Sequence, residues 1–512
     1  MGLLHGILFV LLIPLCAAHR KTYRAAVVEY HPLGDRHDNA SHILNLNVAE
    51  YETLIEEAKR KGADIVVFPE YGLTQLAASS SRNLAIQFAQ SVPTPPAPGT
   101  PSSAAQVPCL LPNSSMAIRR LSCSARENQI YVVVNLLEIA PCSITDHACP
   151  EDGFFIYNTN VAFDRNGGVV SKYHKYNLFK EPSVNTPKHS MYSTFDTDFG
   201  VTFGMFICFD ILFEDPGYTL VKRMNVNNMI YSTAWISELP FLTATQTQQS
   251  WSLGLGVNLL ASGFNNPMGG NGGSGIYAGG SGRLNLLMPS TAGTTLLLAD
   301  VPVVSSNRLR GDSLSEPELS LDLQTGNQAT SGHMFVLHDD LSNYKSSEVL
   351  KNGLNELNMC QNNLCCNFKA DVQLSSNGSQ APKYRFVITD SIIKYARTYP
   401  AHVQVCGLIY CKGDDVSKCV YFPDLPETLD NVSFRSLGIS GNFSSPRMVL
   451  PSTLTTSLEP LKISSGNLME KDEAITLEYN SDTRGLLTFA LYGRIFQQNM
   501  IRNEEIMDND IY

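Results

Sequence analysis

The stretch Phe206-Ile207-Cys208-Phe209-Asp210-Ile211-Leu212-Phe213 sets the expectations for the fold and chemistry of this chain. It ends a largely apolar run that begins at Val201, so a lone cysteine stands at the end of a buried strand. Two other segments share this design, because residues 65–70 end a strand in Glu70 and residues 169–179 carry Lys175 just past a strand. A base, a cation and a thiol at strand ends, in that chain order, indicate amide chemistry through a thioester.

Length and charge limit the class of protein. The 512 residues are too many for one ordinary domain, so we expect two domains, one of them large. A hydrophobic content of 43% with 17% charged residues is typical of a globular protein. The net charge of -11 argues against nucleic acid or an anionic membrane surface as the main partner.

The two ends of the chain favour a secreted, extracellular protein. Residues 1–18 have the pattern of a signal peptide, since the apolar run from Gly6 to Cys16 is short for a membrane span and small residues close it. The C-terminus has no hydrophobic tail, so no GPI signal is visible, and no other run has transmembrane length. Five Asn-x-Ser/Thr sequons agree with this route and are the predicted glycosylation sites: Asn39, Asn113, Asn377, Asn431 and Asn442.

Cysteine usage favours the same oxidising compartment. Of twelve cysteines, Cys16 leaves with the signal, and Cys208 stands far from its neighbours Cys149 and Cys360. An odd cysteine in a secreted protein is either an intermolecular bridge or a reactive thiol. The adjacent pair Cys365-Cys366 and the lack of paired CxxC units argue against zinc, so we expect no metal and no cofactor. The ten remaining cysteines can all pair: Cys109, Cys123, Cys142, Cys149, Cys360, Cys365, Cys366, Cys406, Cys411 and Cys419.

Strand-like and helix-like segments alternate through the first 300 residues. Apolar runs that are buried on both faces, alternating with amphipathic helices, predict an α/β sheet covered by helices. We expect strands over 25–30, 64–68, 130–136, 154–163, 203–207 and 229–232, helical segments over 48–60 and 84–88, and a Pro-rich surface loop over 92–112.

The character of the chain changes near residue 303. A polar stretch is followed by cysteine-rich, alternating strand-like runs over 384–388, 403–410 and 486–492, which predict a smaller β-rich domain stapled by disulfides. The expected organisation is therefore a signal peptide (1–18), a catalytic domain (19–305), a linker (306–332) and a β-rich C-terminal domain (333–512).

Each of the three strand-end residues also has a simpler interpretation when taken alone. Cys208 fits a buried structural thiol, Glu70 an acid at a helix N-terminus and Lys175 a solvated lysine. The combination is more informative, because we expect all three at strand ends of one sheet, where α/β proteins place their sites. A carboxylate can move the thiol proton to the leaving amine and then activate water, while an ammonium and a backbone N–H stabilise the oxyanion.

These motifs resemble a known family. Phe68-Pro69-Glu70, Tyr173-His174-Lys175 and Cys208-Phe209-Asp210 resemble the Glu–Lys–Cys motifs of the nitrilase superfamily. Longer segments, and a cysteine-rich tail that contains Leu364-Cys365-Cys366, are similar to the vanin and biotinidase branch over nearly the whole chain. The longer segments are Tyr173 to Phe179, Cys208 to Phe213, Asp215-Pro216, Thr233-Ala234-Trp235 and Gly273 to Tyr277.

The resemblance implies a fold and three roles. The fold is a four-layer αββα nitrilase-type sandwich followed by a smaller β-rich, disulfide-containing C-terminal domain. Glu70 is then the base, Lys175 the oxyanion stabiliser and Cys208 the nucleophile.

The resemblance also implies three supporting residues. Glu181 matches a second family glutamate that orients the lysine, although Glu151 and Glu214 are alternatives nearby in the sequence. Trp235 is expected near the pocket, and Asn258 is expected to support the site.

Several features depart from the branch or suggest other functions. Tyr71 follows Glu70 where the branch usually has an acidic residue, so pocket contacts next to the base are expected to differ. The GxGxxG match at 270–275 precedes further glycines, not a helix, which argues against a dinucleotide site. Arg310-Gly311-Asp312 has the form of an adhesion motif, and His174 suggests a Cys–His pair, but the Glu and Lys motifs outweigh both.

The resulting functional expectation is a secreted amidohydrolase that acts on a small-molecule linear carboxamide. By resemblance the substrate is pantetheine, cleaved to pantothenate and cysteamine, with biotin amides such as biocytin as the alternative within the same chemistry. A catalytically inactive secreted binding or adhesion protein is the alternative from another class. The sequence leaves the disulfide connectivity, the oligomeric state and the acyl-pocket residues open.

Overall fold

The computed structural model describes the chain in ten stretches: residues 20–35, 37–97, 99–100, 102–143, 145–304, 334–374, 382–413, 415–420, 429 and 431–496. The expected signal peptide and linker, the Arg310-Gly311-Asp312 motif and the sequon asparagine Asn377 lie outside the described residues.

Two six-stranded sheets form the centre of the first domain. The first sheet has the order β13 (Thr295–Pro302), β1 (Thr22–Glu29), β2 (Ile65–Val67), β3 (Tyr131–Pro141), β4 (Phe154–Phe163) and β5 (Val169–His174). The second has the order β12 (Gly282–Leu287), β11 (Ser274–Ala278), β10 (Asn258–Gly263), β8 (Asn228–Thr233), β7 (Thr202–Ile207) and β6 (Thr194–Asp196).

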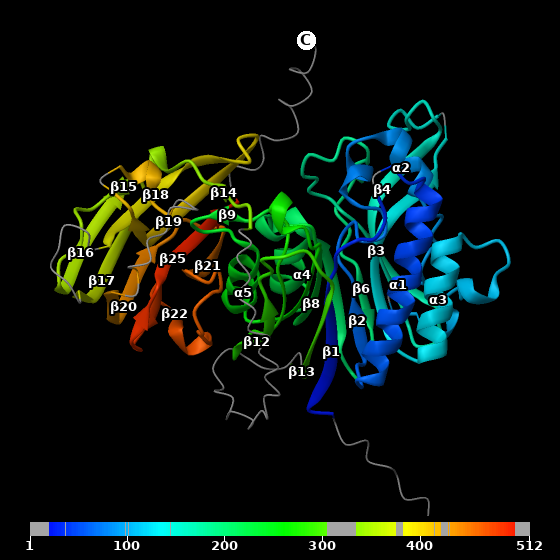
Figure 1. Cartoon of the computed structure of the whole chain (residues 1–512), viewed down its shortest axis with the longest axis horizontal. Coiled ribbons are helices and arrows are strands. Elements are labelled where there is room, and N and C mark those ends of the chain that lie inside the picture. The colour runs from blue at the N-terminus through cyan, green and yellow to red at the C-terminus, as the bar shows by residue number, and fades with distance from the viewer. Residues whose placement is uncertain are drawn as a thin grey trace, which may run out of the picture.

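Helices cover the outer face of each sheet. From right to left, Figure 1 shows helices, the first sheet, the second sheet and further helices, which is the αββα arrangement expected from the sequence. One apolar core lies between the first sheet and its helices, and a larger one fills the space between the sheets. The helices are α1 (Ala40–Arg60), α2 (Arg82–Phe88) and α3 (Met116–Asn128) beside the first sheet, and α4 (Thr219–Lys222) and α5 (Ala244–Leu255) beside the second.

Helix α1 begins eight residues earlier than the expected Val48. The side chain of Asn39 accepts a hydrogen bond from the backbone N–H of His42 at 2.8 Å, and this capping bond starts the helix at Ala40. The first turns also bury Ile43 and Leu44, so the apolar face extends further towards the N-terminus than the periodicity after residue 48 indicated.

The second domain is built from two antiparallel sheets, as expected for a β-rich unit. Its five-stranded sheet has the order β15 (Lys345–Ser346), β18 (Lys383–Tyr395), β19 (Tyr399–Cys411), β25 (Leu486–Ile495) and β21 (Arg447–Thr455). The other sheet contains β16 (Gly353–Gln361), β17 (Leu364–Leu374), β20 (Val432–Asn442), β23 (Ala474–Tyr479) and β22 (Leu468–Lys471), with β24 (Thr483–Arg484) beside β20.

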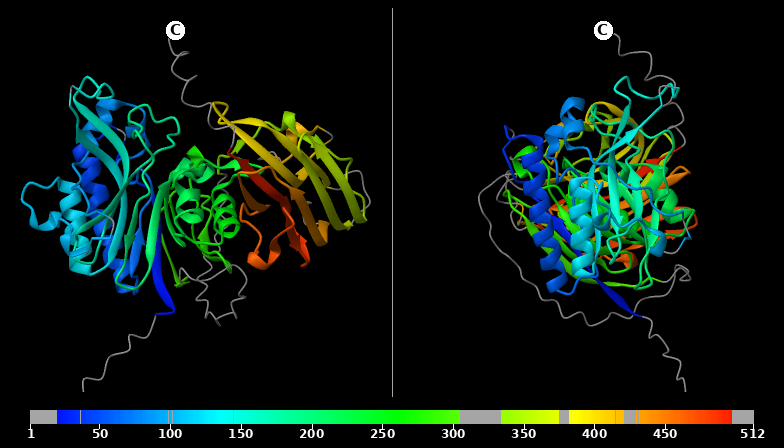
Figure 2. Two further views of the ribbon diagram at one scale, coloured as in Figure 1. Left: turned by 180° about the vertical axis from the view of Figure 1, so that it is seen from behind. Right: turned by 90° about the vertical axis from the view of Figure 1, so that its right-hand side faces the viewer.

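Helix α5 joins the two domains. Nearly all of its residues are buried although many are polar, because one side packs on the second sheet and the other faces the β-rich domain. Its polar side chains find partners across the junction: Gln246 donates to the Ser452 hydroxyl at 2.8 Å, and Gln249 donates to the Leu461 carbonyl at 2.8 Å. The left view of Figure 2 shows the green segment that contains α5 between the rest of the first domain and the β-rich domain.

A short parallel strand pair adds a second connection. Strand β9 (Glu238–Leu239), from the first domain, pairs with β14 (Leu337–His338) at the start of the second. The backbone N–H of Asp339 continues this pairing by donating to the Leu239 carbonyl at 2.8 Å. The main apolar core therefore runs without interruption from the space between the sheets into the β-rich domain.

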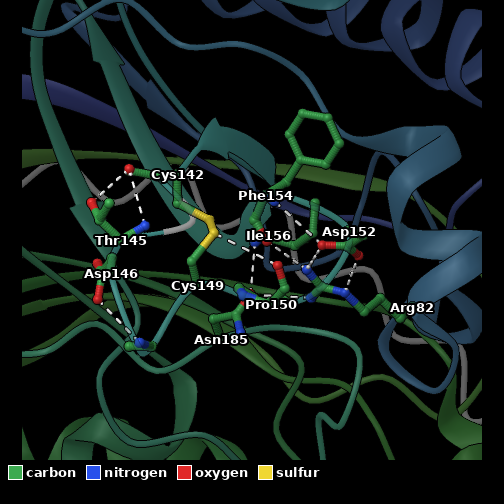
Figure 3. The surroundings of a disulfide bond; sticks show 12 residues. Arg82, Cys142, Thr145, Asp146, Cys149, Pro150, Asp152, Phe154, Ile156 and Asn185 are labelled. Atoms are coloured by element: carbon green, nitrogen blue, oxygen red, sulfur yellow. Dashed lines mark hydrogen bonds and ion pairs between the residues drawn. A yellow bond between two sulfur atoms is a disulfide. The ribbon is translucent and has the colours of Figure 1, made fainter.

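Ten cysteines are paired, and Cys208 is the free one among the described residues. Cys142–Cys149, shown in Figure 3, closes part of the β3–β4 connection, and Cys366–Cys406 joins the two sheets of the second domain. The other pairs are Cys109–Cys123, Cys360–Cys365 and Cys411–Cys419.

Helical segments within the described residues lack the combination of length and apolarity that is needed to cross a bilayer. Asn39, Asn113, Asn431 and Asn442 are all exposed, so the four described sequons lie on the surface. Their glycosylation stays a prediction.

Candidate active site

Three loops that follow strands bring the predicted residues together. Glu70 lies three residues after β2, Lys175 directly follows β5, and Cys208 directly follows β7. The expectation that all three end strands of one sheet was wrong, because β7 belongs to the second sheet. The site lies between the sheets, and this explains why all three side chains are buried.

Lys175 bridges two buried carboxylates. Its Nζ donates to Glu70 Oε1 at 2.7 Å and to Glu181 Oε1 at 2.5 Å. Asn158, on β4, donates from its Nδ2 to Glu70 Oε1 and Glu181 Oε2, both at 2.8 Å. An ammonium has three N–H donors. Two of them bind these carboxylates, and the third is available to another acceptor.

The shared burial of these charges separates the pKa values of the two glutamates. Burial raises the pKa of Glu70, the Lys175 charge opposes this, and the nearby charge of Glu181 adds to the increase, so the net shift is upward. Burial also acts to raise the pKa of Glu181, but Lys175 and the hydrogen bonds to Glu181 overcome it, so that pKa is lowered. Burial alone would lower the pKa of Lys175, yet the charges of Glu181 and Glu70 raise it well above its ordinary value. Glu181 and Lys175 are therefore the stable ion pair, and Glu70 is the group that can gain and lose a proton.

The loop that carries Glu181 is anchored to β4. Asn185 accepts hydrogen bonds through its Oδ1 from the backbone N–H of Ile156 at 2.8 Å and from Arg82 Nη1 at 3.1 Å. Arg82 also forms an ion pair with Asp152 at 2.6 Å, and Figure 3 shows these side chains beside the Cys142–Cys149 disulfide. Because Asn158, which donates to Glu181, is on the same strand as Ile156, both contacts hold this loop against β4.

Cys208 has an unusual backbone conformation. Its φ of 48° places a non-glycine residue in the left-handed region, at the start of the 3-10 turn Cys208–Leu212. Such conformations persist where surrounding contacts hold them, and they are frequent at functional sites. Burial raises the pKa of the Cys208 thiol, and the charge of Glu70 adds to that increase, so the resting sulfur is protonated at neutral pH.

Asp210 holds this turn against the loop that carries Lys175. Its carboxylate accepts hydrogen bonds from the backbone N–H of Ile207 at 3.0 Å and from the Tyr173 hydroxyl at 2.8 Å. It also accepts the backbone N–H of Asn177 at 2.9 Å and the Asn177 side-chain amide at 2.8 Å. Burial raises its pKa to about 6, so the carboxylate that organises these donors is ionised at neutral pH.

A pocket opens at Cys208. Its walls are largely apolar and aromatic, which is typical of a small-molecule site. Cys208 is in the lining and is 7% exposed, whereas Glu70 and Lys175 are buried and are not among the lining residues. The remaining lining residues are Phe179, Phe209, Leu212, Ala234, Trp235, Ile236, Glu238, Leu242, Leu337, Tyr395 and Ala396.

The second domain supplies one wall of this pocket. Tyr395 ends β18 and Ala396 follows it in the turn to β19, and the ring centroid of Tyr395 lies 5.8 Å from that of Phe209. The hydroxyl of Tyr399, which begins β19, accepts the backbone N–H of Lys180 at 2.6 Å. The pocket is therefore complete only when both domains are in place.

Comparisons with known proteins agree with this geometry. Residues 24–251 match the family model of the carbon-nitrogen hydrolases, and residues 334–499 match that of the vanin C-terminal domain. Vanin-like protein 3 of Drosophila melanogaster is 34% identical to the chain, over 94% of this chain and 90% of the relative. The chain belongs to the vanin branch of the nitrilase superfamily.

Other relatives in this branch carry an enzymatic name. The proteins named pantetheinase from Mus musculus and Homo sapiens are each 31% identical to this chain, over 95% of it and 91% of the relative. Among solved structures, an amidase from Nesterenkonia sp. is 18% identical, covers 55% of this chain and 91% of that chain, and has a TM-score of 0.38. As a carbon-nitrogen hydrolase of the vanin branch, the protein is an amide-cleaving enzyme.

The three supporting residues expected in this hydrolase differ in whether they contact the cluster or the pocket. Glu181 contacts Lys175, whereas Glu151 is exposed and Glu214 pairs with Arg223. Trp235 lines the pocket, with its indole N–H donating to the Leu242 carbonyl at 2.8 Å.

Asn258, expected to support the site, lies at the other end of its strand from the cluster, and its role stays a prediction. It opens β10 beside Asn228, at the start of β8, and donates to Asn228 Oδ1 at 2.8 Å. The site lies near the other end of these parallel strands, where the Thr233 hydroxyl donates to Tyr231 and Tyr231 donates to the Cys208 carbonyl. Five residues of extended strand separate the two ends by about 16 Å.

Sequence reasoning missed several residues around Glu70. Tyr71, which was noted only as a departure, donates its hydroxyl to Glu181 Oε2 at 2.6 Å. The backbone N–H of Ala234 donates to Glu70 Oε2 at 2.8 Å, and Asn135 donates to Asn158 Oδ1 at 2.7 Å. Asn158 left a usable signal, because three consecutive polar residues interrupt an otherwise apolar strand at 158–160.

We predict that Asp210→Ala destabilises the protein strongly. The substitution leaves four donors without their acceptor, and each buried unpaired group costs about 1–3 kcal/mol, so the free energy of unfolding should fall by roughly 3 kcal/mol or more. Urea unfolding measures this change.

Glu214→Ala is the matched control, because Glu214 pairs with an exposed Arg223 and such pairs contribute about 1 kcal/mol or less. Equal losses of stability in the two variants would show that Asp210 does not hold the turn.

Proposed function

We propose that this enzyme hydrolyses pantetheine to pantothenate and cysteamine through a thioester on Cys208, and that it does so outside the cell. The observation that supports the chemistry most is the buried cluster in which Lys175 holds Glu70 beside a strained, unpaired cysteine at the base of a pocket. The substrate is proposed from the relatives named pantetheinase, which cover nearly the whole chain.

The first half of the proposed reaction forms the thioester. Glu70 accepts the thiol proton of Cys208 as the sulfur attacks the amide carbon, because the resting thiol is protonated and Glu70 is the carboxylate that can take a proton. The third N–H of Lys175 stabilises the oxyanion, since its other two donate to Glu70 and Glu181. The carbon–nitrogen bond then breaks, Glu70 returns the proton to the nitrogen, and cysteamine leaves.

The second half regenerates the enzyme. Glu70, ionised again, takes a proton from water, and the hydroxide oxygen attacks the thioester carbon. Lys175 stabilises the second oxyanion in the same position. The carbon–sulfur bond breaks, the Cys208 sulfur recovers its proton from Glu70, and pantothenate leaves.

Extracellular location is proposed from three features. Five disulfides are present among the described residues, an apolar segment with the pattern of a signal peptide begins the chain, and the described sequons are exposed. Stable disulfides form in the secretory route and rarely in the cytosol.

We predict that protein recovered from the medium of expressing cells releases cysteamine from pantetheine, and that Cys208→Ala abolishes this release. Loss of a nucleophile of this kind lowers the rate by at least about a thousandfold. The primary amine of released cysteamine, which pantetheine itself lacks, is followed with purified wild type, Cys208→Ala and the surface control Met224→Ala, with biocytin as the competing substrate.

Preferential release of lysine from biocytin would show that biotin amides, and not pantetheine, are the substrate. Undiminished turnover by Cys208→Ala would contradict the mechanism. A wild type that cleaves neither substrate would make an inactive binding protein the better interpretation. Absence of the protein from the medium would contradict secretion.

The pH profile tests the role of the charge cluster. Glu70 must be ionised to act as a base, so kcat/KM should fall as the pH drops through its raised pKa, above the ordinary glutamate value of 4.5. Because the charge of Glu181 raises the pKa of Glu70, Glu181→Gln should move this acidic limb to lower pH.

The exposed Glu151 offers the control, since Glu151→Gln removes one carboxylate without touching the cluster. A limb that stays in place in Glu181→Gln, or that moves equally in both variants, would show that Glu70 is not the titrating base.

A further inference from the structure

One polar residue in the pocket has no role in the chemistry described above. Glu238, on β9, lines the same cavity as Cys208 and is the only carboxyl among the lining residues that the structure describes. Its backbone N–H and carbonyl pair with Leu242, which holds the residue in place. Its side chain makes no hydrogen bond or ion pair within the described part of the chain.

Within the described residues, no cation compensates a charge on Glu238. The charge that acts on it is that of Asp339, which follows β14 in the second domain and is itself partly buried. Nearby Tyr344 and Tyr395 have raised pKa values through burial and are neutral at physiological pH. A partly buried carboxyl with no protein partner is free to bind a ligand group, so a ligand that hydrogen-bonds to it gains affinity.

The protonation state limits which ligand group fits. Burial, with the charge of Asp339, raises the pKa of Glu238 to about 8 and that of Asp339, mainly through burial, to about 7. Near neutral pH a Glu238 carboxyl of this kind is largely protonated and offers one O–H donor together with an acceptor oxygen. Uncharged groups that both donate and accept, such as a hydroxyl or a secondary amide, complement it.

We propose that Glu238 is a specificity-determining residue that binds a hydroxyl or amide group on the acyl chain of the substrate. Phe179, Phe209, Trp235 and Tyr395 line the same pocket and would contact the apolar parts of that chain. The inference rests on the proposed function, because the cysteamine released from pantetheine carries neither a hydroxyl nor an amide. The hydrogen-bonding group must therefore be on the acyl side.

The test compares two substrates and two variants. The substrates are pantetheine and a simple N-acylcysteamine of similar length whose chain has no hydroxyl and no second amide. Glu238→Leu removes the hydrogen-bonding group, whereas Glu238→Gln keeps a donor and an acceptor without the capacity to ionise.

We expect Glu238→Leu to raise KM for pantetheine by about tenfold with little change in kcat, because the contact is distant from the reacting atoms. Its KM for the simple N-acylcysteamine should be unchanged or lower. Glu238→Gln should stay within about threefold of wild type on both substrates.

Three results would overturn the proposal. Equal increases of KM on both substrates would indicate a structural role, and an unchanged KM for pantetheine in Glu238→Leu would indicate no contact. A loss in Glu238→Gln as large as in Glu238→Leu would indicate that the pocket reads a cation through an ionised carboxylate.

Cysteamine release by wild type and its absence in Cys208→Ala, in the same assay, separate this inference from the proposed function. If wild type and Cys208→Ala behave as proposed while the Glu238 variants do not, only the proposed role of Glu238 is contradicted. If wild type does not cleave pantetheine, both fail.

Discussion

The contact on which the site depends is the Lys175 ammonium held between the carboxylates of Glu70 and Glu181. Two buried carboxylates with one cation carry an excess negative charge, which the cluster relieves by letting one carboxylate bind a proton readily. Glu181 has further donors in Tyr71 and Phe179, so it stays ionised, and Glu70 becomes the proton acceptor. In the proposed mechanism the same arrangement leaves one Lys175 donor for the oxyanion, so a single buried ion cluster would supply both the base and the electrostatic stabilisation.

The second domain belongs to the active site as well as to the stability of the chain. Arg494, a fully buried residue of β25, donates to the carbonyls of Leu212 and His402, and thereby ties the turn that begins at Cys208 to the β-rich domain. The β18–β19 hairpin, which contains Tyr395, closes the pocket, and the β9–β14 pair sets Glu238 beside Asp339. The first domain supplies the residues of the proposed chemistry, and the β-rich domain supplies part of the pocket wall.

The sequence predicted the parts of the site that depend on local patterns. Glu70, Lys175 and Cys208 each follow an apolar strand, and that pattern can be read without knowledge of the sheet order. It could not show that the strands belong to two sheets, or that Asn258 lies at the far end of its strand, because both depend on strand pairing. Asn158 and Glu238 were missed for a similar reason, since their importance arises from partners that approach from distant parts of the chain.

In the proposed mechanism one acyl-enzyme, a thioester on Cys208, lies on the path of every amide with the same acyl group. The most direct measurement adds hydroxylamine to reactions with pantetheine and with a pantothenoyl anilide, and determines the ratio of pantothenoyl hydroxamate to pantothenate. A common thioester predicts the same ratio for both substrates, because the departing amine has left before hydroxylamine and water compete. A ratio that depends on the departing amine would mean that water attacks the amide directly, and would contradict the account.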